Sequence, residues 1–225
     1  MPAFAFSRQP EAGAWFGSGQ GKALLVTESL LAERWLVGRP AHPVLWVAPS
    51  GHQRREDSGA GPVGRRLCLQ THDSGFEGDV RCSLPLPLPT ESVGSVIVQH
   101  ACEIGPAGLL DECARVLAPG GRLLLLSLNP LSLYRFRWGG QGLRVAESGR
   151  WQEALRHAGL HAFIGEEQYL GPLWRRAMDG ADAHGAATSG NRLRAVCVQE
   201  AEKRAVSPIQ PLPARRGWNA GAAPA

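Results

Sequence analysis

The segment SVIVQHACEIGPAGLLDECARVLAPGGRLLLLSLNP, residues 95 to 130, decides the fold class of this 225-residue chain. It begins at 95–100 with a β-branched apolar run that is typical of a buried strand. The Pro-Gly-Gly at 119–121 is expected to end the helix that follows, before a second apolar run at 122–128. Strand, helix and strand in this order predict parallel pairing within an α/β sheet. The apolar stripe of the helix consists of Leu109, Leu110, Cys113, Val116 and Leu117.

The residues before this segment continue the pattern. GKALLVTESLLAERWL at 21–36 predicts a helix that stops at Gly38, and PVLWV at 43–47 predicts a strand buried on both faces. RRLCLQ at 65–70 predicts a second strand, and GDVRC at 78–82 a short third one. Glycine and proline between the first two strands leave room for two helical turns at most, around 53–57. The helix at 21–36 has Leu24, Leu25, Glu28, Leu31, Trp35 and Leu36 at helical spacing.

The residues after it complete the domain. RWQEALRHAGL at 150–160 predicts a helix, and the runs at 161–170 and 192–201 predict two strands that can form an antiparallel edge. We therefore predict an α/β domain at 15–204, with a mostly parallel central sheet and helices on both faces. A flexible N-terminus at 1–14 and a disordered Pro/Ala/Arg tail at 205–225 are expected to flank it.

Composition excludes several function classes. The net charge is +4 with scattered arginines, so a nucleic-acid partner is not expected. The five cysteines have no metal-ligand spacing and read as reduced core thiols. FGSGQGKA at 16–23 is not a phosphate-binding loop, because Phe16 stands where the first glycine is needed. Without a long apolar run or a leader pattern, we expect a cytoplasmic protein with no membrane partner and no metal.

Residues 86–133 carry a resemblance to a known family. The LPLP loop around Leu86 and Pro87, the His-x-x-Glu of His100 and Glu103, the run RVLAPGG at 115–121 and the Asn-Pro at 129–130 match a shared pattern. They resemble class I S-adenosylmethionine (SAM) dependent methyltransferases, in particular the small bacterial type 11 methyltransferase-domain proteins. The resemblance implies a Rossmann-like fold and SAM as cofactor, with an acceptor and an oligomeric state that the sequence does not identify.

The family pattern also assigns a cofactor site. It implies a glycine-containing loop after the first strand, which here reads VAPSGHQ with Gly51 as its glycine, and an acid after the second strand, here Asp73. The position that contacts adenine in the family holds Cys82 here, beside Ser83. The expected cofactor-binding residues are therefore Val47, Ala48, Gly51, Asp73, Cys82, Ser83 and His100.

Two alternatives stay open for the residues after the fourth and fifth strands. His100 is a candidate catalytic base or cofactor contact, and otherwise a hydrogen-bonded structural histidine at the end of its strand. Asn129, Tyr134 and Arg135 are expected to bind substrate, and otherwise to belong to a plain connecting loop.

Two functions follow from these residues. The first is an enzyme, a SAM-dependent methyltransferase whose acceptor is unknown. The second is a catalytically degenerate member of the fold that acts as a binding or regulatory module. The second rests on the loop at 48–51, which keeps one glycine, and on Cys82 at a position where the family usually has an Asp.

Overall fold

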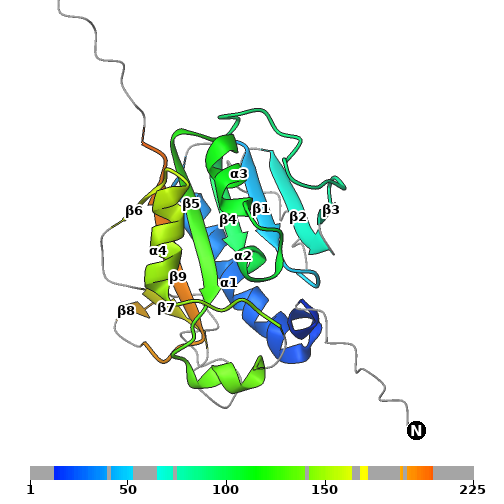
Figure 1. Cartoon of the computed structure of the whole chain (residues 1–225), viewed down its shortest axis with the longest axis vertical. Coiled ribbons are helices and arrows are strands. Elements are labelled where there is room, and N and C mark those ends of the chain that lie inside the picture. Colours follow the sequence, from blue (N-terminus) through cyan, green and yellow to red (C-terminus); the bar gives the residue numbers. More distant parts are fainter. Residues whose placement is uncertain are drawn as a thin grey trace, which may run out of the picture.

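A computed structural model describes residues 13–39, 42–52, 65–72, 75–139, 142–163, 168–171, 188–189 and 192–204 of the chain (Figure 1). The expected helix around 53–57, Asp73 and the two terminal segments lie outside these residues, apart from 13 and 14. The described helices are η1 (Ala14–Gly17), α1 (Gly19–Val37), α2 (Ala101–Ile104), α3 (Leu109–Val116), η2 (Leu133–Arg137) and α4 (Ser148–His157).

The described strands form one mixed sheet in the order β3-β2-β1-β4-β5-β9-β7-β8, and β6 pairs with β9. The pairs β1 with β2, β1 with β4, and β4 with β5 are parallel. The pairs of β9 with β5, β6 and β7 are antiparallel, which confirms the expected antiparallel edge. The strands are β1 (Val44–Ala48), β2 (Arg66–His72), β3 (Gly75–Gly78), β4 (Val93–Gln99), β5 (Leu117–Leu128), β6 (His161–Ala162), β7 (Gln168–Leu170), β8 (Thr188–Ser189) and β9 (Val196–Glu202).

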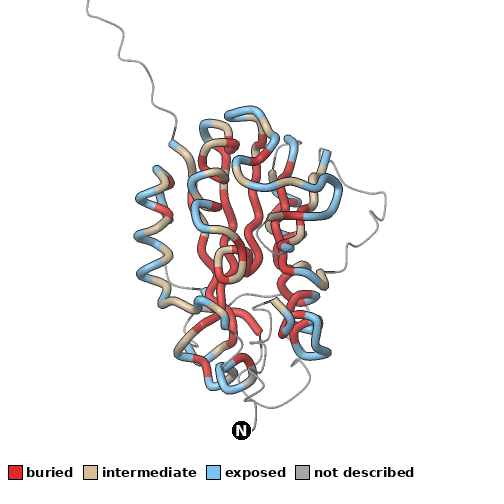
Figure 2. Tube along the Cα trace, turned by 45° about the vertical axis from the view of Figure 1, so that its right-hand side comes forward, coloured by how far each residue is buried: buried red, intermediate tan, exposed pale blue. Residues whose placement is uncertain are grey.

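Helices cover both faces of the sheet, and the buried residues lie between the layers (Figures 1 and 2). One apolar cluster joins α1 to one face of β1, β4, β5 and β9, and includes Leu24, Trp46, Ile97 and Leu126. The second joins α3 and α4 to the other face, through residues such as Leu45, Val98, Cys113 and Leu155. The alternation of side chains along each strand sends successive residues into opposite clusters. The predicted three-layer α/β architecture is confirmed.

The start of α1 is fixed by local contacts. Ser18 is the N-cap, and its side-chain oxygen accepts a hydrogen bond from the Gly21 N–H at 3.1 Å. A Cβ atom at Gly21 would lie 2.4 Å from the carbonyl oxygen of Trp15 and 2.6 Å from the Cα of Phe16. Glycine at position 21 therefore lets η1 fold back tightly against the first turn of α1.

Two predicted boundaries are wrong. The helix does not reach the Pro-Gly-Gly run, because α3 ends at Val116 and Leu117 is already extended with φ −70° and ψ 129°. Pro119 disfavours helical backbone at the residue before it, and Leu117 pairs with Val93 as the first residue of β5. The break therefore lies inside the strand rather than at the end of the helix.

The expected third strand at 78–82 is also wrong. The strand is β3, which forms a hairpin with β2 and runs antiparallel to it. Asp79 ends this hairpin, because its N–H donates to the Cys68 carbonyl at 3.0 Å and its carboxylate accepts from the Cys68 N–H at 2.8 Å. Cys82 then contacts Phe76 through an isolated bridge. β2 itself runs to His72, two residues further than predicted, so Asp73 directly follows it.

All five cysteines are free thiols. Burial raises the pKa of Cys113 to about 12 and the pKa of Cys102 well above its ordinary value. Among the described helices, none has both the length and the apolar character that a membrane-spanning helix needs.

Candidate functional site

The strand order reverses at β1, which has β2 on one side and β4 on the other. In open α/β sheets, ligands bind outside the carboxyl ends of the strands at such a switch point. The chain leaves β1 through the turn at 49–52, and it leaves β4 at His100. These two points border the candidate site.

The turn after β1 is closed by a hydrogen bond from the His52 N–H to the Pro49 carbonyl at 3.2 Å. Gly51 has φ +96°, a conformation that favours glycine. The side chain of Gln70, two residues before the end of β2, donates to the His52 carbonyl at 2.9 Å and so ties the turn to the neighbouring strand. Val47 and Ala48 are buried before the turn, in the two opposite core clusters.

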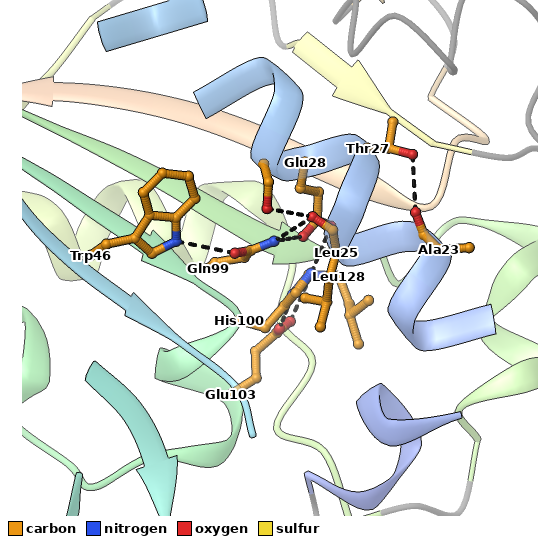
Figure 3. A network of polar contacts seen from close by, with 10 residues as sticks. Ala23, Leu25, Thr27, Glu28, Trp46, Gln99, His100, Glu103 and Leu128 are labelled. Atoms are coloured by element: carbon orange, nitrogen blue, oxygen red, sulfur yellow. Dashed lines mark hydrogen bonds and ion pairs between the residues drawn. The ribbon is translucent and has the colours of Figure 1, made fainter. Parts of the chain in front are cut away.

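His100 lies at the centre of a buried polar network (Figure 3). Its Nε2 lies 2.7 Å from a carboxylate oxygen of Glu28, on α1, and its Nδ1 lies 2.7 Å from one of Glu103, on α2. The side chains of these three residues have no exposed surface. His100 also has φ +51°, so its backbone adopts the left-handed region at the start of α2. Both ring nitrogens therefore have partners inside the protein.

The network gives each carboxylate oxygen one donor. Glu28 accepts from His100 and, at 2.7 Å, from the side-chain amide of Gln99. Glu103 accepts from His100 and, at 2.7 Å, from the Leu128 N–H. The amide of Gln99 is oriented because its oxygen accepts from Trp46 Nε1 at 3.2 Å. Four donors for four oxygens match two ionised carboxylates around an imidazolium ring, a cluster with a net charge of −1.

The raised pKa of His100 agrees with this arrangement, whereas the burial of Glu103 opposes its ionised form. Burial alone lowers the pKa of His100, but the charges of Glu28 and Glu103 and their hydrogen bonds outweigh it and raise the pKa to about 10. Burial raises the pKa of Glu103, against the opposing effects of His100 and the Leu128 N–H. The cluster therefore keeps its proton at neutral pH.

The short helix η1 covers this end of the sheet. The ring of Phe16 stacks on the His100 ring, and Trp15 packs edge-on against Trp138 at 5.5 Å between ring centroids. A Cβ at Gly51 would lie 3.5 Å from the Phe16 carbonyl oxygen, so η1 also touches the turn after β1. Residues from the start of the chain thus contact the ends of both strands that border the switch point.

Comparison with solved structures identifies this arrangement. A Haloferax volcanii protein described as a methyltransferase, in complex with the Trm112 methyltransferase activator, superposes with a TM-score of 0.54 at 19% identity, covering 88% of this chain and 100% of that one. The chain has the class I methyltransferase fold. SAM-dependent methyltransferases from Thermotoga maritima and Archaeoglobus fulgidus each superpose with a TM-score of 0.49. Their identities are 14% and 13%, with 86% and 84% of this chain and 100% and 98% of theirs covered.

The sequence comparisons find no counterpart. No protein-family model matches the chain, and no curated protein is significantly similar to it.

In this methyltransferase fold, η1 and the loop at 82–83 both lie close to the ends of the strands at the switch point. Gly51 has a positive φ, and the side of the turn where it lacks a Cβ faces the backbone of η1. Cys82 is half-buried, Ser83 is exposed, and two backbone hydrogen bonds tie Cys82 to Phe76 near the end of β2. A Cβ at Gly75 would lie 2.7 Å from the Cys82 carbonyl oxygen, so glycine there allows this loop to reach the strand end.

The predicted substrate residues occupy different environments in the methyltransferase fold. Asn129 is buried, and its side-chain amide donates to the carbonyls of Arg192 and Arg194, both at 2.8 Å. Its side-chain oxygen accepts from the Leu131 N–H at 3.0 Å. Arg135 is exposed on η2, and Tyr134 belongs to the same helix. Asn129 therefore joins the end of β5 to the segment before β9, while Arg135 remains accessible.

Sequence reasoning missed several parts of the site. η1, Gln99 and Trp46 were not predicted to contribute, although Trp15 and Phe16 are an aromatic pair directly before a helix N-cap. The described residues contain no group of three or more His, Cys, Asp or Glu arranged to hold a metal ion.

Proposed function

We propose that the chain is a SAM-dependent methyltransferase whose methyl acceptor is not yet identified. The observation that carries the proposal is the switch point of a class I methyltransferase fold, where the glycine turn and the buried cluster follow the neighbouring parallel strands β1 and β4. In sheets of this type the crevice at that point is the ligand site.

Five of the seven predicted cofactor residues have a contact with SAM in this proposal. The backbone of the turn at Ala48 and Gly51 would hold the amino acid part of SAM. Asp73 would accept hydrogen bonds from the ribose, and the loop at Cys82 and Ser83 would border the adenine. The extension of β2 to His72 supports the role of Asp73, because Asp73 is then the next residue in the sequence after the strand.

Bound SAM supplies the activated methyl group, and the protein's task is to align the acceptor with it. We assign His100 to positioning rather than to proton abstraction, because both of its ring nitrogens contact carboxylates and its side chain has no exposed surface. η2 is the proposed acceptor side, because Arg135 is exposed there together with Leu133 and Phe136, which are 45% and 64% exposed.

Calorimetric titration with SAM and with S-adenosylhomocysteine (SAH), after a check for carried-over cofactor, tests this function. We expect dissociation constants near the micromolar range, about −8 kcal/mol. A Gly51→Val variant should bind both ligands at least tenfold more weakly, since a β-branched residue is strained at φ +96°. Gly149→Ala on α4 is the control, because a Cβ there meets no atom within 4 Å.

A folded parent protein that binds neither ligand at millimolar concentration would overturn the proposal. The degenerate binding module would then be the better description of the chain, and its partner would be the next target.

A further inference from the structure

The Glu28–His100–Glu103 cluster carries a net negative charge that no neighbouring cation balances among the described contacts. The partners of its four carboxylate oxygens are His100, Gln99 and the Leu128 N–H. Arg144 is the nearby cation, but it donates to the backbone carbonyls of Glu103 and Gly105 and not to a carboxylate. An unbalanced charge in the interior costs free energy and attracts a counter-charge.

The net charge of the cluster is the same whether the shared proton lies on His100 or on one of the two carboxylates. An imidazolium between two carboxylates has a net charge of −1, and so does a neutral imidazole between one carboxylate and one carboxylic acid. A further proton on Glu103 would have no acceptor, because its two oxygens already receive hydrogen bonds from His100 and Leu128. The hydrogen-bond pattern therefore favours a net charge of −1 for the cluster.

The cluster lies where its charge can act on a ligand. It is at the carboxyl end of β4, beside the switch point, and Phe16 and α1 cover it so that its side chains have no exposed surface. Water and salt screen buried charges much less than exposed ones.

We propose that the Glu28–His100–Glu103 cluster is the counter-charge for a cationic methyl donor, so that the protein binds SAM in preference to its neutral product SAH. This inference rests on the proposed function. The sulfonium of SAM is positive; when its methyl group bonds to the electron pair of an acceptor, the electrons of the broken carbon–sulfur bond stay on sulfur, which becomes neutral. The same cluster that favours donor binding would then favour product release.

The first test uses the unmodified protein and three ligands in calorimetric titrations. SAM carries a sulfonium, sinefungin carries an ammonium group in its place, and SAH carries neither. We expect SAM and sinefungin to bind roughly tenfold more tightly than SAH, the size expected for one charge roughly 12 Å away at an effective dielectric constant of about 20. Binding of SAH as tight as that of SAM, or tighter, would overturn the inference.

The second test removes the charge. The double variant Glu28→Gln and Glu103→Gln leaves His100 neutral between two amides, and should lower the SAM-to-SAH preference roughly tenfold while changing SAH affinity little. Glu33→Gln is the matched control, since Glu33 is also an acid of α1 but pairs with Arg66 at 2.7 Å. Circular dichroism reports whether the double variant folds. If it does not fold, the titrations of the unmodified protein with SAM, sinefungin and SAH test the inference.

The outcomes separate the two proposals. If the parent protein binds neither SAM nor SAH, the proposed function fails and this inference fails with it. If both ligands bind and the double variant keeps the parent's preference, the inference alone fails.

Discussion

The ring of Phe16 lies against the ring of His100, with their centroids 4.7 Å apart and an angle of 27° between their planes. This contact joins η1, near the start of the chain, to the end of β4. His100 also contacts Glu28 and Glu103. Its side chain therefore connects η1, which covers the candidate site, with the buried carboxylates.

Replacing Phe16 by Ala should therefore destabilise the protein strongly. Phe16 has no exposed surface, and such truncations in a core cost about 3–5 kcal/mol. Phe136→Ala is the control, because that ring is 64% exposed and its loss should change the free energy of unfolding by no more than about 0.5 kcal/mol. Urea unfolding followed by tryptophan fluorescence measures both. Equal effects would mean that Phe16 is not packed as described.

Two glycines of α1 should respond in opposite ways to alanine. Gly21→Ala should destabilise by about 1–3 kcal/mol, because its Cβ would meet Trp15 and Phe16 backbone at 2.4 and 2.6 Å. Gly19→Ala should be neutral or stabilising by up to about 1 kcal/mol, because a Cβ there meets nothing within 4 Å. Thermal unfolding of the two variants side by side checks this. A stabilised Gly21→Ala protein would show that η1 does not pack on α1.

Stability should fall as the pH rises above neutrality. The pKa of His100 is 6.5 in its ordinary state and about 10 in the folded protein, so the folded state keeps a proton that the unfolded chain releases between these values. Its contribution is complete below pH 6.5 and is lost as the pH approaches about 10, with a slope of up to about 1.4 kcal/mol per pH unit.

Urea unfolding at several pH values across this window measures the slope. His100→Gln should flatten it, whereas His157→Gln should leave it as in the parent, since His157 is exposed. A parent protein whose stability does not change across this range would contradict the buried imidazolium.

Asn129 should act on stability rather than on substrate binding. Asn129→Ala removes both hydrogen bonds to the carbonyls of Arg192 and Arg194, and should cost about 2 kcal/mol or more. Arg135→Ala should change stability little, because Arg135 is exposed, and should instead weaken binding of an acceptor once one is known. Denaturant titration of the two variants distinguishes these roles. An Asn129→Ala protein as stable as the parent would restore Asn129 as a candidate substrate contact.

The sequence predicted the layers of the fold because apolar periodicity reports which face of an element is buried. It was correct for α1, β1, β4 and the antiparallel edge. It failed where a turn depends on a contact distant in the sequence. The hairpin of β2 and β3 depends on Asp79 reaching back to Cys68, and no local pattern in 78–82 indicates that contact.

The candidate site was predictable only in part for the same reason. Glu28 falls on the apolar face of its helix, which is a signal for a buried and partnered acid. Its partner could not be read from the sequence, because periodicity gives the face of a helix and not the residue opposite to it. The sequence pattern around Phe16 shows only that this residue stands where a phosphate-binding loop would need a glycine. It does not predict the contact of Phe16 with His100.

Glu28 and His100 are separated by 72 residues in the sequence, and their contact has a consequence for how the chain folds. If α1 docks on the sheet one helical turn out of place, the Glu28 carboxylate is buried without its donors, and the His100 Nε2 loses its partner. Apolar contacts alone discriminate weakly between neighbouring registers, since leucine can replace leucine at the interface. We therefore expect the cluster to select a single register of α1.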